Sequence, residues 1–258
     1  MSDFKVAMLA SGSKGNAALI SNDKQNFLVD IGISCRMLNT KLKTLGLEIK
    51  DLDGVFLTHE HSDHVKGLET FCKNYQVPVY SSEKTWHAVL MRNRNIDRRN
   101  CRIIKGSMLC GDVKINSFNI SHDAADPHGY SFTSQKGKCT YVTDTGFVTE
   151  AIKNEAQNAD MLVLEANHDI TMLKNGIYPE LLKKRILSTR GHLSNDSAGW
   201  FLASLEQLPE QIILAHLSQE NNLPSVALQT VENILQEKNK LQNTRILLAS
   251  QENIVKTF

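Results

Sequence analysis

The sequence predicts a layered α/β fold, and three observations support this prediction. Short runs of β-branched and apolar residues recur throughout the 258 residues, and segments with helical spacing lie between many of them. No low-complexity tract or Pro/Gly/Ser-rich linker divides the sequence, which contains only five prolines. Apolar residues make up 41% of the chain, enough for a sizeable buried core. We therefore predict one domain over residues 1–258.

Strands are predicted wherever a short apolar or β-branched run is bounded by turn-forming residues. In chain order these runs cover residues 5–10, 17–22, 26–32, 54–59, 77–82, 101–105, 113–122, 139–146, 161–167, 211–218 and 245–250. Helices are predicted where apolar residues recur with helical periodicity. They cover residues 34–45, 63–75, 82–93, 148–158, 194–207 and 224–240. A second strand-rich block, from Cys101 to Gly146, repeats the organisation of the first, so we predict two packed β-rich halves with helices outside.

Charge and composition exclude several classes of protein. The 29 lysines and arginines nearly balance the 28 aspartates and glutamates, so overall charge predicts neither a polyanion nor a membrane partner. The N-terminal stretch contains no apolar run of signal-peptide length, and runs such as MLVLEA are too short to span a bilayer. We therefore expect a cytoplasmic protein. The five cysteines never form a C-x-x-C pair, which argues against a disulfide framework or a thiolate zinc site.

Histidines concentrate in the stretch LTHEHSDHVKG, residues 57–67. His59 and His61, two positions apart, cannot share a helical face, but at the extended end of the preceding strand they project to the same side. Asp63 and His64 follow where the next helix begins. A polar surface loop is the alternative, yet three histidines beside an aspartate at a strand end form a metal-ligand pattern. Imidazole with carboxylate suits zinc, manganese or iron.

Further metal-ligand candidates stand at the ends of later strands. His122 closes the run VKINSFNISH, Asp144 closes CTYVTD, and His216 lies in IILAHLS. The four candidates within residues 59–64 are spaced too closely for all of them to reach one ion easily, which favours two ions. A carboxylate such as Asp144 has two oxygens and can bridge two cations. We therefore predict a site for two divalent metal ions, zinc or manganese.

Asp30 in LVDIG, the H-x-H-x-D-H motif of residues 59–64 and the three later candidates together resemble the ordered motifs of the metallo-β-lactamase superfamily. The resemblance runs from Asp30 to His216 and its motifs are specific. It implies a four-layered αββα sandwich with a dinuclear site at the rim between the two sheets. It also implies a ligand set, in which one ion binds His59, His61 and His122, the second binds Asp63, His64 and His216, and Asp144 bridges them. Asp30 would hold the histidine loop in place from behind the ligands.

Two metal ions about 3.5–4 Å apart make water reactive at neutral pH and clamp the oxygens around an attacked centre. This chemistry alone leaves β-lactams, thioesters, lactones and phosphodiesters open as substrates. Diiron redox members of the superfamily typically carry glutamate at the second histidine of the motif, so His61 favours hydrolysis. We count Asp63 as a catalytic residue as well as a ligand.

The segment GHLSNDSAGWFLASL, residues 191–205, resembles the nucleic-acid-processing branch of the superfamily, in which a non-ligand histidine precedes a capped helix. The resemblance implies that His192 contacts the scissile phosphate and protonates the leaving oxygen, and that Glu165 in LEANHD orients it. His168 and Asn195 would contribute to substrate binding. The alternatives are a surface histidine before a helix and, for Glu165, a simple salt bridge.

The loop LASGSKGNAALI, residues 9–20, places Ser11, Ser13 and Asn16 in a tight turn between two strands. A β-hairpin explains its glycines, but exposed N–H groups and small hydroxyls also form an anion nest. We therefore predict that these three residues bind substrate. Together with the segments around Glu165 and His192, this loop makes the closest resemblance the YycJ/WalJ group of single-domain DNA exonucleases.

The resemblance thus implies a metal-dependent phosphodiesterase, specifically a 5′-to-3′ DNA exonuclease acting on a nucleic-acid end. A basic cluster from Lys84 to Lys105, with seven cationic residues against one acidic, would follow a phosphate backbone or form a solvated helix face. The alternative functions are a hydrolase of small molecules (a cyclic phosphodiester, thioester or lactone) and a non-catalytic metal-binding regulator. The sequence does not predict an oligomeric state.

Overall fold

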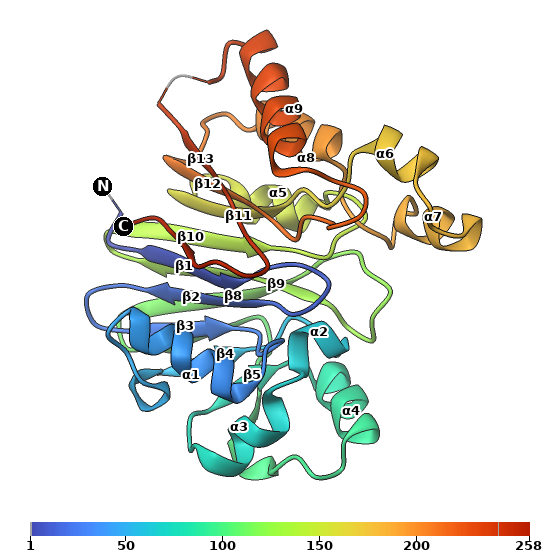
Figure 1. The fold of residues 1–258 in the computed structure, drawn as a ribbon. Helices are drawn as coiled ribbons and strands as arrows, with labels where there is room; N and C mark the ends of the chain where they lie inside the picture. Colours follow the sequence, from blue (N-terminus) through green and yellow to red (C-terminus); the bar gives the residue numbers. More distant parts are fainter. Residues whose placement is uncertain (1, 242) are drawn as a thin grey trace.

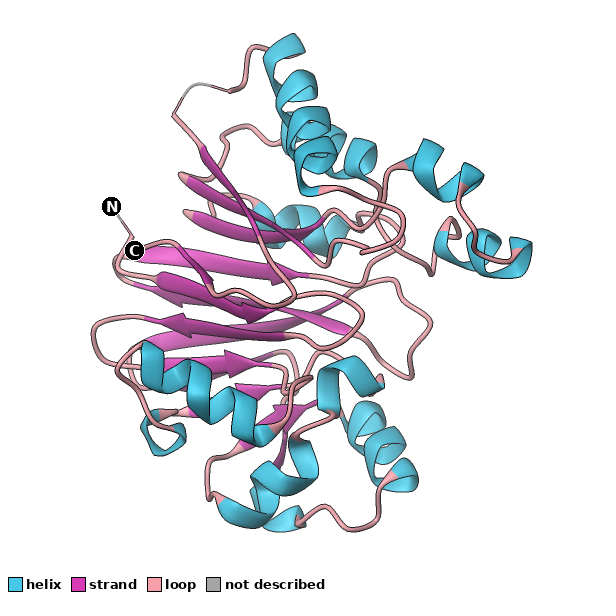
Figure 2. Ribbon diagram, in the orientation of Figure 1, coloured by secondary structure: helices cyan, strands magenta, loops and turns pink. Residues whose placement is uncertain are grey.

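The computed structural model describes residues 2–241 and 243–258 and shows two β-sheets packed face to face, with helices on both outer faces (Figure 1, Figure 2). The N-terminal half, blue to cyan in Figure 1, forms most of one sheet, and the green to red half forms the other. This is the predicted αββα sandwich, built from two β-rich halves.

Each sheet has seven strands, in the orders β14-β1-β2-β3-β4-β5-β6 and β13-β12-β11-β10-β9-β8-β7. The N-terminal sheet consists of β14 (Val255–Lys256), β1 (Lys5–Ala10), β2 (Ala17–Ser21), β3 (Asn26–Val29), β4 (Gly54–Phe56), β5 (Val79–Ser81) and β6 (Cys101–Ile103). The C-terminal sheet consists of β13 (Arg245–Leu248), β12 (Gln211–Ala215), β11 (Met161–Glu165), β10 (Gly137–Val142), β9 (His128–Ser134), β8 (Val113–Asn119) and β7 (Ser107–Cys110).

The helices divide between the two outer faces. Those of the N-terminal half are α1 (Cys35–Thr44), α2 (Ser62–Val65), α3 (Leu68–Asn74) and α4 (Glu83–Arg92), with the 3₁₀ turns η1 (Ile49–Asp51) and η2 (Arg98–Asn100). Those of the C-terminal half are α5 (Glu150–Ala156), α6 (Ile170–Asn175), α7 (Glu180–Ile186), α8 (Asn195–Ser204) and α9 (Pro224–Glu237). Within the described residues, no helix combines the length and apolarity needed to cross a bilayer. All five cysteines are free thiols, in agreement with the expectation of no disulfide framework.

Apolar side chains fill the three spaces between these four layers. On β1, Met8 faces the space between the sheets, whereas the next residue, Leu9, faces α1 and α3. This alternation follows from the period of two in a strand. In the space between the sheets, the rings of Phe27 and Phe132 stack with centroids 5.3 Å apart. Truncating either ring to alanine would cost about 3–5 kcal/mol of folding stability.

Six strands end at one rim of the sandwich. β3 and β4 are parallel neighbours, and so are β10, β11 and β12. β8 and β10 both run antiparallel to β9, so they also end at the same edge of their sheet. Because residues that follow parallel strands emerge at one edge, polar residues distant in the chain collect at this rim.

Some predicted elements differ from the observed ones. The predicted strand 54–59 ends at Phe56, and the predicted helix 63–75 is divided into α2 and α3. The division occurs because the N–H of Gly67 donates to the carbonyl of Ile31 (2.8 Å) and not to a helical partner. Three observed strands (β7, β9 and β14) and two observed helices (α6 and α7) lie outside the predicted elements.

Candidate metal centre

The histidine loop, residues 57–64, follows β4 at this rim. β4 ends before His59, so this residue lies in the loop and not at a strand end as predicted. His61 has extended backbone (φ −65°, ψ 150°) and immediately precedes α2, which carries Asp63 and His64. The rings of His59 and His61 converge, with centroids 4.5 Å apart. The expected convergence therefore arises from a loop that leads into a helix.

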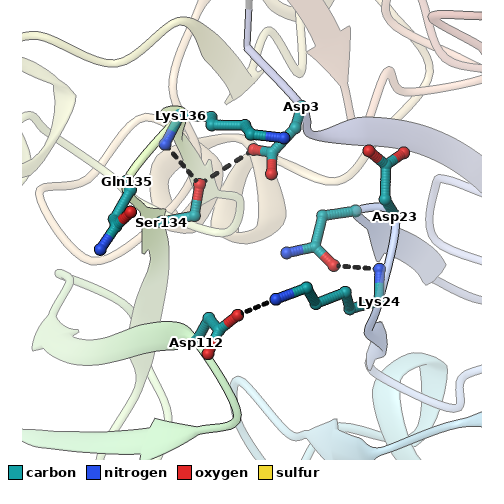
Figure 3. A pocket seen from close by; sticks show the side chains of 8 residues that line it. Asp3, Asp23, Lys24, Asp112, Ser134, Gln135 and Lys136 are labelled. Carbon is teal, nitrogen blue, oxygen red and sulfur yellow. Dashed lines mark hydrogen bonds and ion pairs between the residues drawn. The ribbon is translucent and has the colours of Figure 1, made fainter.

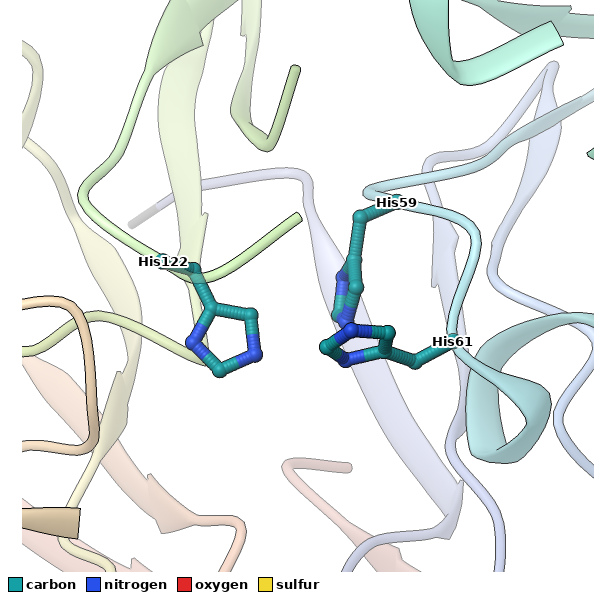
Figure 4. Close-up of side chains that lie close together, drawn as sticks. All are labelled: His59, His61 and His122. Carbon is teal, nitrogen blue, oxygen red and sulfur yellow. The ribbon is translucent and has the colours of Figure 1, made fainter. Parts of the chain in front are cut away.

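His122 joins these two histidines from the other sheet. It lies beyond the end of β8, and its ring centroid is 5.0 Å from that of His59 and 5.1 Å from that of His61 (Figure 4). One donor nitrogen from each of the three residues lies within 4.8 Å of the others. This spacing suits one ion with nitrogen ligands at about 2 Å. We refer to His59, His61 and His122 as the triple-histidine group.

A second group of donors, the acidic group, consists of Asp63, His64 and His216. The Oδ2 atom of Asp63 lies 3.3 Å from Nε2 of His64 and 3.7 Å from Nε2 of His216. Asp144 lies between the two groups, with Oδ2 3.3 Å from Nε2 of His64 and Oδ1 4.0 Å from Nε2 of His122. Oδ1 also lies 3.4 Å from Nδ1 of His216, so the Asp144 carboxylate reaches both groups, as a bridging ligand requires.

Four of the imidazoles are held through Nδ1. The partners of this nitrogen are Thr58 Oγ1 for His59 (3.0 Å), Asp30 Oδ2 for His64 (2.8 Å), Gly191 O for His122 (3.1 Å) and Glu165 Oε1 for His216 (3.0 Å). Such bonds fix the orientation of a ring and leave Nε2 available as a metal ligand. Asp30 also accepts from the N–H of Thr58 (2.8 Å), so it supports the histidine loop at two points.

Within residues 2–241 and 243–258, several of the atoms aimed at the centre lack a hydrogen-bond partner. They are Nε2 of His59, Nε2 of His216 and Oδ2 of Asp144, all buried. Buried polar atoms are normally paired, so an unpaired set that converges on one point calls for a ligand. Nitrogen and carboxylate donors in this arrangement fit zinc or manganese. The residues present therefore fit a metal centre.

The two groups differ in charge. Burial and the neighbouring imidazoles hold the pKa of His59 well below its usual range. Burial by itself would lower the pKa of His216, but Asp144 and the other nearby carboxylates outweigh this effect and raise the pKa to about 10. His59 of the triple-histidine group therefore disfavours a proton, whereas the acidic group attracts positive charge. A divalent cation would supply this positive charge and displace protons from the acidic group as it bound.

Glu165, the last residue of β11, is fully buried behind the centre. Its Oε1 lies 2.7 Å from Nδ1 of His192 and 3.0 Å from Nδ1 of His216. Its Oε2 accepts the N–H groups of Thr145 (2.8 Å) and Leu193 (3.1 Å). Burial raises the pKa of Glu165, yet the two imidazoles lower it well below its usual range, so the carboxylate is ionised. The Glu165 carboxylate thus holds both His216, a ligand candidate, and His192, the predicted acid.

His192 lies above this carboxylate and is partly exposed, with 21% of its side chain accessible. Its ring centroid is 5.1 Å from that of His122 and 5.3 Å from that of His216. The N–H of His192 donates to the carbonyl of Ile186 at the end of α7 (3.0 Å). His192 is thus held at the edge of the centre without a position among the six donors of the two groups.

Three site residues have left-handed backbone, which side chains other than glycine rarely adopt. They are Asp30 (φ 63°), Asp144 (φ 57°) and His216 (φ 56°), each at or just beyond the end of a strand. This conformation costs on the order of 1–3 kcal/mol per residue. The turn directs each side chain from the end of its strand into the rim.

The loop of residues 11–16 lies directly behind the acidic group. Ser11 accepts the N–H of His216 (2.8 Å), and the Asn16 amide donates to Oδ2 of Asp63 (3.2 Å). Ser11 and Asn16 are buried, whereas Ser13 is exposed. The predicted substrate role of these three residues stays a prediction, and the observed contacts give Ser11 and Asn16 a supporting position.

His168 and Asn195 lie beneath the centre. Both are buried, and neither ring nitrogen of His168 has a hydrogen-bond partner in the part of the chain that the structure describes. The Asn195 and Asn222 amides bond each other reciprocally at 2.9 Å in both directions. A substrate role for His168 and Asn195 stays a prediction that must accommodate this burial. Asn222 is not among the predicted site residues, because a lone asparagine carries no motif.

The basic cluster from Lys84 to Lys105 lies beside the histidine loop. Arg92, the last residue of α4, donates to the carbonyl of Glu60 (3.0 Å). Trp86 is 4% exposed and belongs to the core. One edge of the cluster therefore touches the centre.

A cavity of about 180 Å³ opens beside His192 and His216. Two charged residues in its wall, Asp123 and Arg185, are absent from the predicted site. Asp123 has Oδ1 3.4 Å from Nε2 of His122, and its Oδ2 accepts from Nε of Arg185 (2.6 Å). Asp123 directly follows the ligand candidate His122, and this position in the sequence is a signal by which it could have been predicted. Arg185 lies on α7, a helix that was not predicted.

A second polar hollow, of about 330 Å³, lies at the opposite ends of the strands (Figure 3). Lys24 pairs there with Asp112, and these side chains are 68% and 62% exposed. Ser134 donates to Asp3 (2.9 Å). These exposed polar groups bond one another, in contrast to the buried, unpaired donors of the rim.

Comparisons with known proteins identify relatives of this chain. Residues 25–217 match the β-lactamase superfamily domain. "Exodeoxyribonuclease YycJ" of Bacillus anthracis is 40% identical over 235 residues, which cover 90% of this chain and 89% of that protein. "Exodeoxyribonuclease WalJ" of Streptococcus pneumoniae is 38% identical over 239 residues, 90% of this chain and 88% of that protein.

Solved structures show the same fold at low identity. The metallo-β-lactamase fold protein YhfI from Bacillus subtilis superposes with a TM-score of 0.73 and 16% identity, covering 99% of this chain and all of that one (100%). At this identity the match supports the architecture alone.

Proposed function

This chain belongs to the metallo-β-lactamase superfamily, and from that premise we propose that it is a metal-dependent phosphodiesterase that degrades DNA from its ends in the 5′-to-3′ direction. The relatives described above are named as exodeoxyribonucleases and match it over most of its length. The observation that carries the proposal is the convergence of two donor groups on Asp144, with His192 beside them. Hydrolysis of a diester needs these two parts, a cation site and a proton donor for the leaving oxygen.

Two ions, zinc or manganese, would occupy the centre. The triple-histidine group would hold one, the acidic group the other, and Asp144 would bridge them. When bound, such ions supply Lewis acidity and lower the pKa of water. Asp63 would act as a ligand and orient the attacking water, with its Oδ2 held by the Asn16 amide (3.2 Å). Asp30 would keep His64 in position, as its 2.8 Å bond to Nδ1 indicates.

His192 would donate a proton to the leaving oxygen. Its Nδ1 is engaged by Glu165 at 2.7 Å, which leaves Nε2 to face substrate. The Glu165 carboxylate behind the imidazole fixes the orientation of the ring, so that Nε2 can be directed at the leaving oxygen. Partial exposure allows the ring to reach a phosphate in the site, whereas the buried His59 and His64 cannot approach one as directly.

The proposal is tested with purified protein whose metals have been removed and restored. Zinc or manganese is added, and single- and double-stranded DNA and RNA, labelled at either end, serve as substrates. We expect labelled mononucleotide to appear first from 5′-labelled DNA and a ladder of shortened products from 3′-labelled DNA. Metal content is measured on the same samples, so that inactivity caused by missing ions is recognised.

Variants Asp63→Ala and His87→Ala form a matched pair for this assay. Asp63 belongs to the acidic group, whereas His87 is exposed on α4 outside the centre. Asp63→Ala should lose cleavage and His87→Ala should retain it. A fully metal-loaded wild-type protein that cleaves no phosphodiester would overturn the proposal. Cleavage of a thioester, a lactone or a cyclic diester in place of DNA would redirect it to small molecules.

We also propose that residues 1–258 act as one domain, as expected from the continuous strand and helix pattern, and that the protein acts in the cytoplasm. The alternation of elements continues without a linker, and this supports the first part of the proposal.

A further inference from the structure

The segment of residues 170–190, which we call the lip, projects beside the centre. It contains α6 and α7, which extend outward from the C-terminal half in Figure 1. Five of its side chains are cationic and one is acidic. Its apolar residues Ile177 and Leu181 are 90% and 82% exposed. A surface that is both cationic and apolar suits a ligand with phosphates and flat bases.

The lip is held rigidly against the centre. The buried Lys183 donates to the carbonyl of Lys174 (2.8 Å), which ties α7 to the end of α6. The carbonyl of Ile186 accepts the N–H of His192 (3.0 Å). A Cβ at Gly191 would overlap this same carbonyl, so glycine permits the close approach. These contacts therefore fix the position of His192 relative to the lip.

The cavity of about 180 Å³ lies between the lip and the centre. The lip supplies Tyr178, Leu182, Arg185 and Ile186 to its wall, and the centre supplies His122, His192 and His216. Because the lip and the centre share this cavity, a group bound at the centre would also contact side chains of the lip. The lip closes one side of it, which suits the end of a strand.

Arg185 is placed to bind a phosphate. Within the described residues its guanidinium bonds Asp123 through Nε alone, which leaves the two terminal amino groups for another acceptor. The side chain is 57% exposed, and its partner Asp123 lies next to His122. Arginine binds phosphate through paired N–H groups, so Arg185 can bind a phosphate next to the one that lies at the centre.

Tyr178 is placed to stack on a base. It precedes Pro179, which starts α7, and a residue before proline favours extended backbone. Tyr178 lines the cavity and is half-buried. Stacking of a base on an aromatic ring tolerates any sequence, as an exonuclease requires.

We propose that the lip is the binding site for the terminal nucleotide of a DNA strand, with Tyr178 stacked on the base and Arg185 bound to a phosphate. This inference rests on the proposed function, because it assigns the substrate end to that same centre. It explains how a centre at an open rim could prefer strand ends, since the lip stops the strand beyond one nucleotide.

Binding is measured by fluorescence anisotropy with a single-stranded oligonucleotide labelled at its 3′ end, in the Asp63→Ala background to prevent cleavage. We expect Tyr178→Ala and Arg185→Ala each to weaken binding about tenfold, as loss of one stacked base or one phosphate contact implies. Tyr178→Phe keeps the ring and should bind as the parent does. Arg245→Ala, on the exposed first residue of β13, removes the same charge away from the lip and serves as the matched control.

A circular single strand of the same composition is the competitor that tests for an end. It should compete much less well than the linear strand against the parent, and this preference should disappear in Tyr178→Ala. Equal competition by the circle, or parental affinity in both alanine variants, would overturn the lip proposal. A wild-type protein that binds linear DNA through the lip but does not cleave it would overturn the proposed function alone.

Discussion

The two sheets contribute to the metal centre in different ways. The N-terminal sheet supplies four donors from one loop of six residues, His59 to His64. The C-terminal sheet supplies His122, Asp144 and His216 from the ends of three strands far apart in the chain. The first set depends on a local loop and a short helix, and the second depends on the alignment of strands.

This difference indicates a division of labour. The N-terminal loop supplies four ligand candidates, of which Asp63 would also orient the attacking water, and Thr58, which holds His59. The C-terminal rim adds His192, Glu165 and the lip, which have no counterpart in the histidine loop. We infer that the N-terminal side mainly holds metal, whereas the C-terminal side both holds metal and handles the substrate. The following predictions test this division, beginning with the largest effect.

His61→Ala should abolish hydrolysis. It removes one of three donors from the triple-histidine group, so one ion should be lost or misplaced. We expect a fall in kcat/KM of about 10³-fold or more, equivalent to about 4 kcal/mol of transition-state stabilisation. Metal content per protein should fall while the far-ultraviolet circular dichroism spectrum is retained. An active variant with normal metal content would show that the N-terminal loop does not hold metal.

His192→Ala should slow turnover without loss of metal. The residue lies outside the two donor groups, and removal of a general acid costs about 10²–10⁴-fold. We expect kcat to fall by such a factor with both ions still bound. Some substrates have a leaving group, such as p-nitrophenolate, that needs no proton. The variant should slow cleavage of such a substrate less than it slows cleavage of DNA. If the variant lost its metals, the separation of roles between the two sides would be wrong.

Asp30→Asn and Glu165→Gln compare the two buried carboxylates behind the histidines. Each change should weaken metal binding about 10–100-fold, because each removes a charged partner of a ligand candidate. At saturating metal, Asp30→Asn should recover most of its kcat, whereas Glu165→Gln should not, because Glu165 also holds His192. Metal titration followed by steady-state kinetics measures both quantities. Equal recovery in the two variants would contradict the division of labour.

Asn222→Ala should reduce stability more than activity. It leaves the buried Asn195 amide without its reciprocal partner, at a cost of about 1–3 kcal/mol. Denaturant unfolding of the metal-free protein measures this cost. Asn16→Ala is the counterpart on the N-terminal side and should also weaken metal binding, because Asn16 contacts Asp63. An Asn222→Ala protein of normal stability would show that this amide pair contributes little.

The sequence predicts the N-terminal part of the centre more readily than the C-terminal part. The histidine loop is local, so its spacing alone reveals a metal pattern. Asp144 and His216 are recognisable because each ends an apolar strand, and the family motif supplies their order. Asp123, Arg185 and Asn222 have no such marker, because their importance arises only when distant segments meet.

The fold shows the same limit. β2, β3 and β12 are continuous apolar runs, and they are predicted. β9 reads HGYSFTS, in which small polar residues alternate with aromatics, and it becomes a strand through pairing with β8 and β10 on both sides. α7 buries only Lys183 and Ile186, so it lacks the apolar stripe by which a helix is recognised.

The left-handed backbone of Asp30, Asp144 and His216 has a consequence for evolution and engineering. Glycine would adopt these conformations at no steric cost, but the buried bonds of Asp30 to Thr58 and His64, and of His216 to Glu165, oppose its entry at those two positions. A library selected for thermal tolerance alone should therefore admit glycine first at Asp144, where Oδ2 has no partner among the described residues, and yield proteins without a working centre. Long-term retention of this aspartate in a lineage would record continuous selection for the reaction itself.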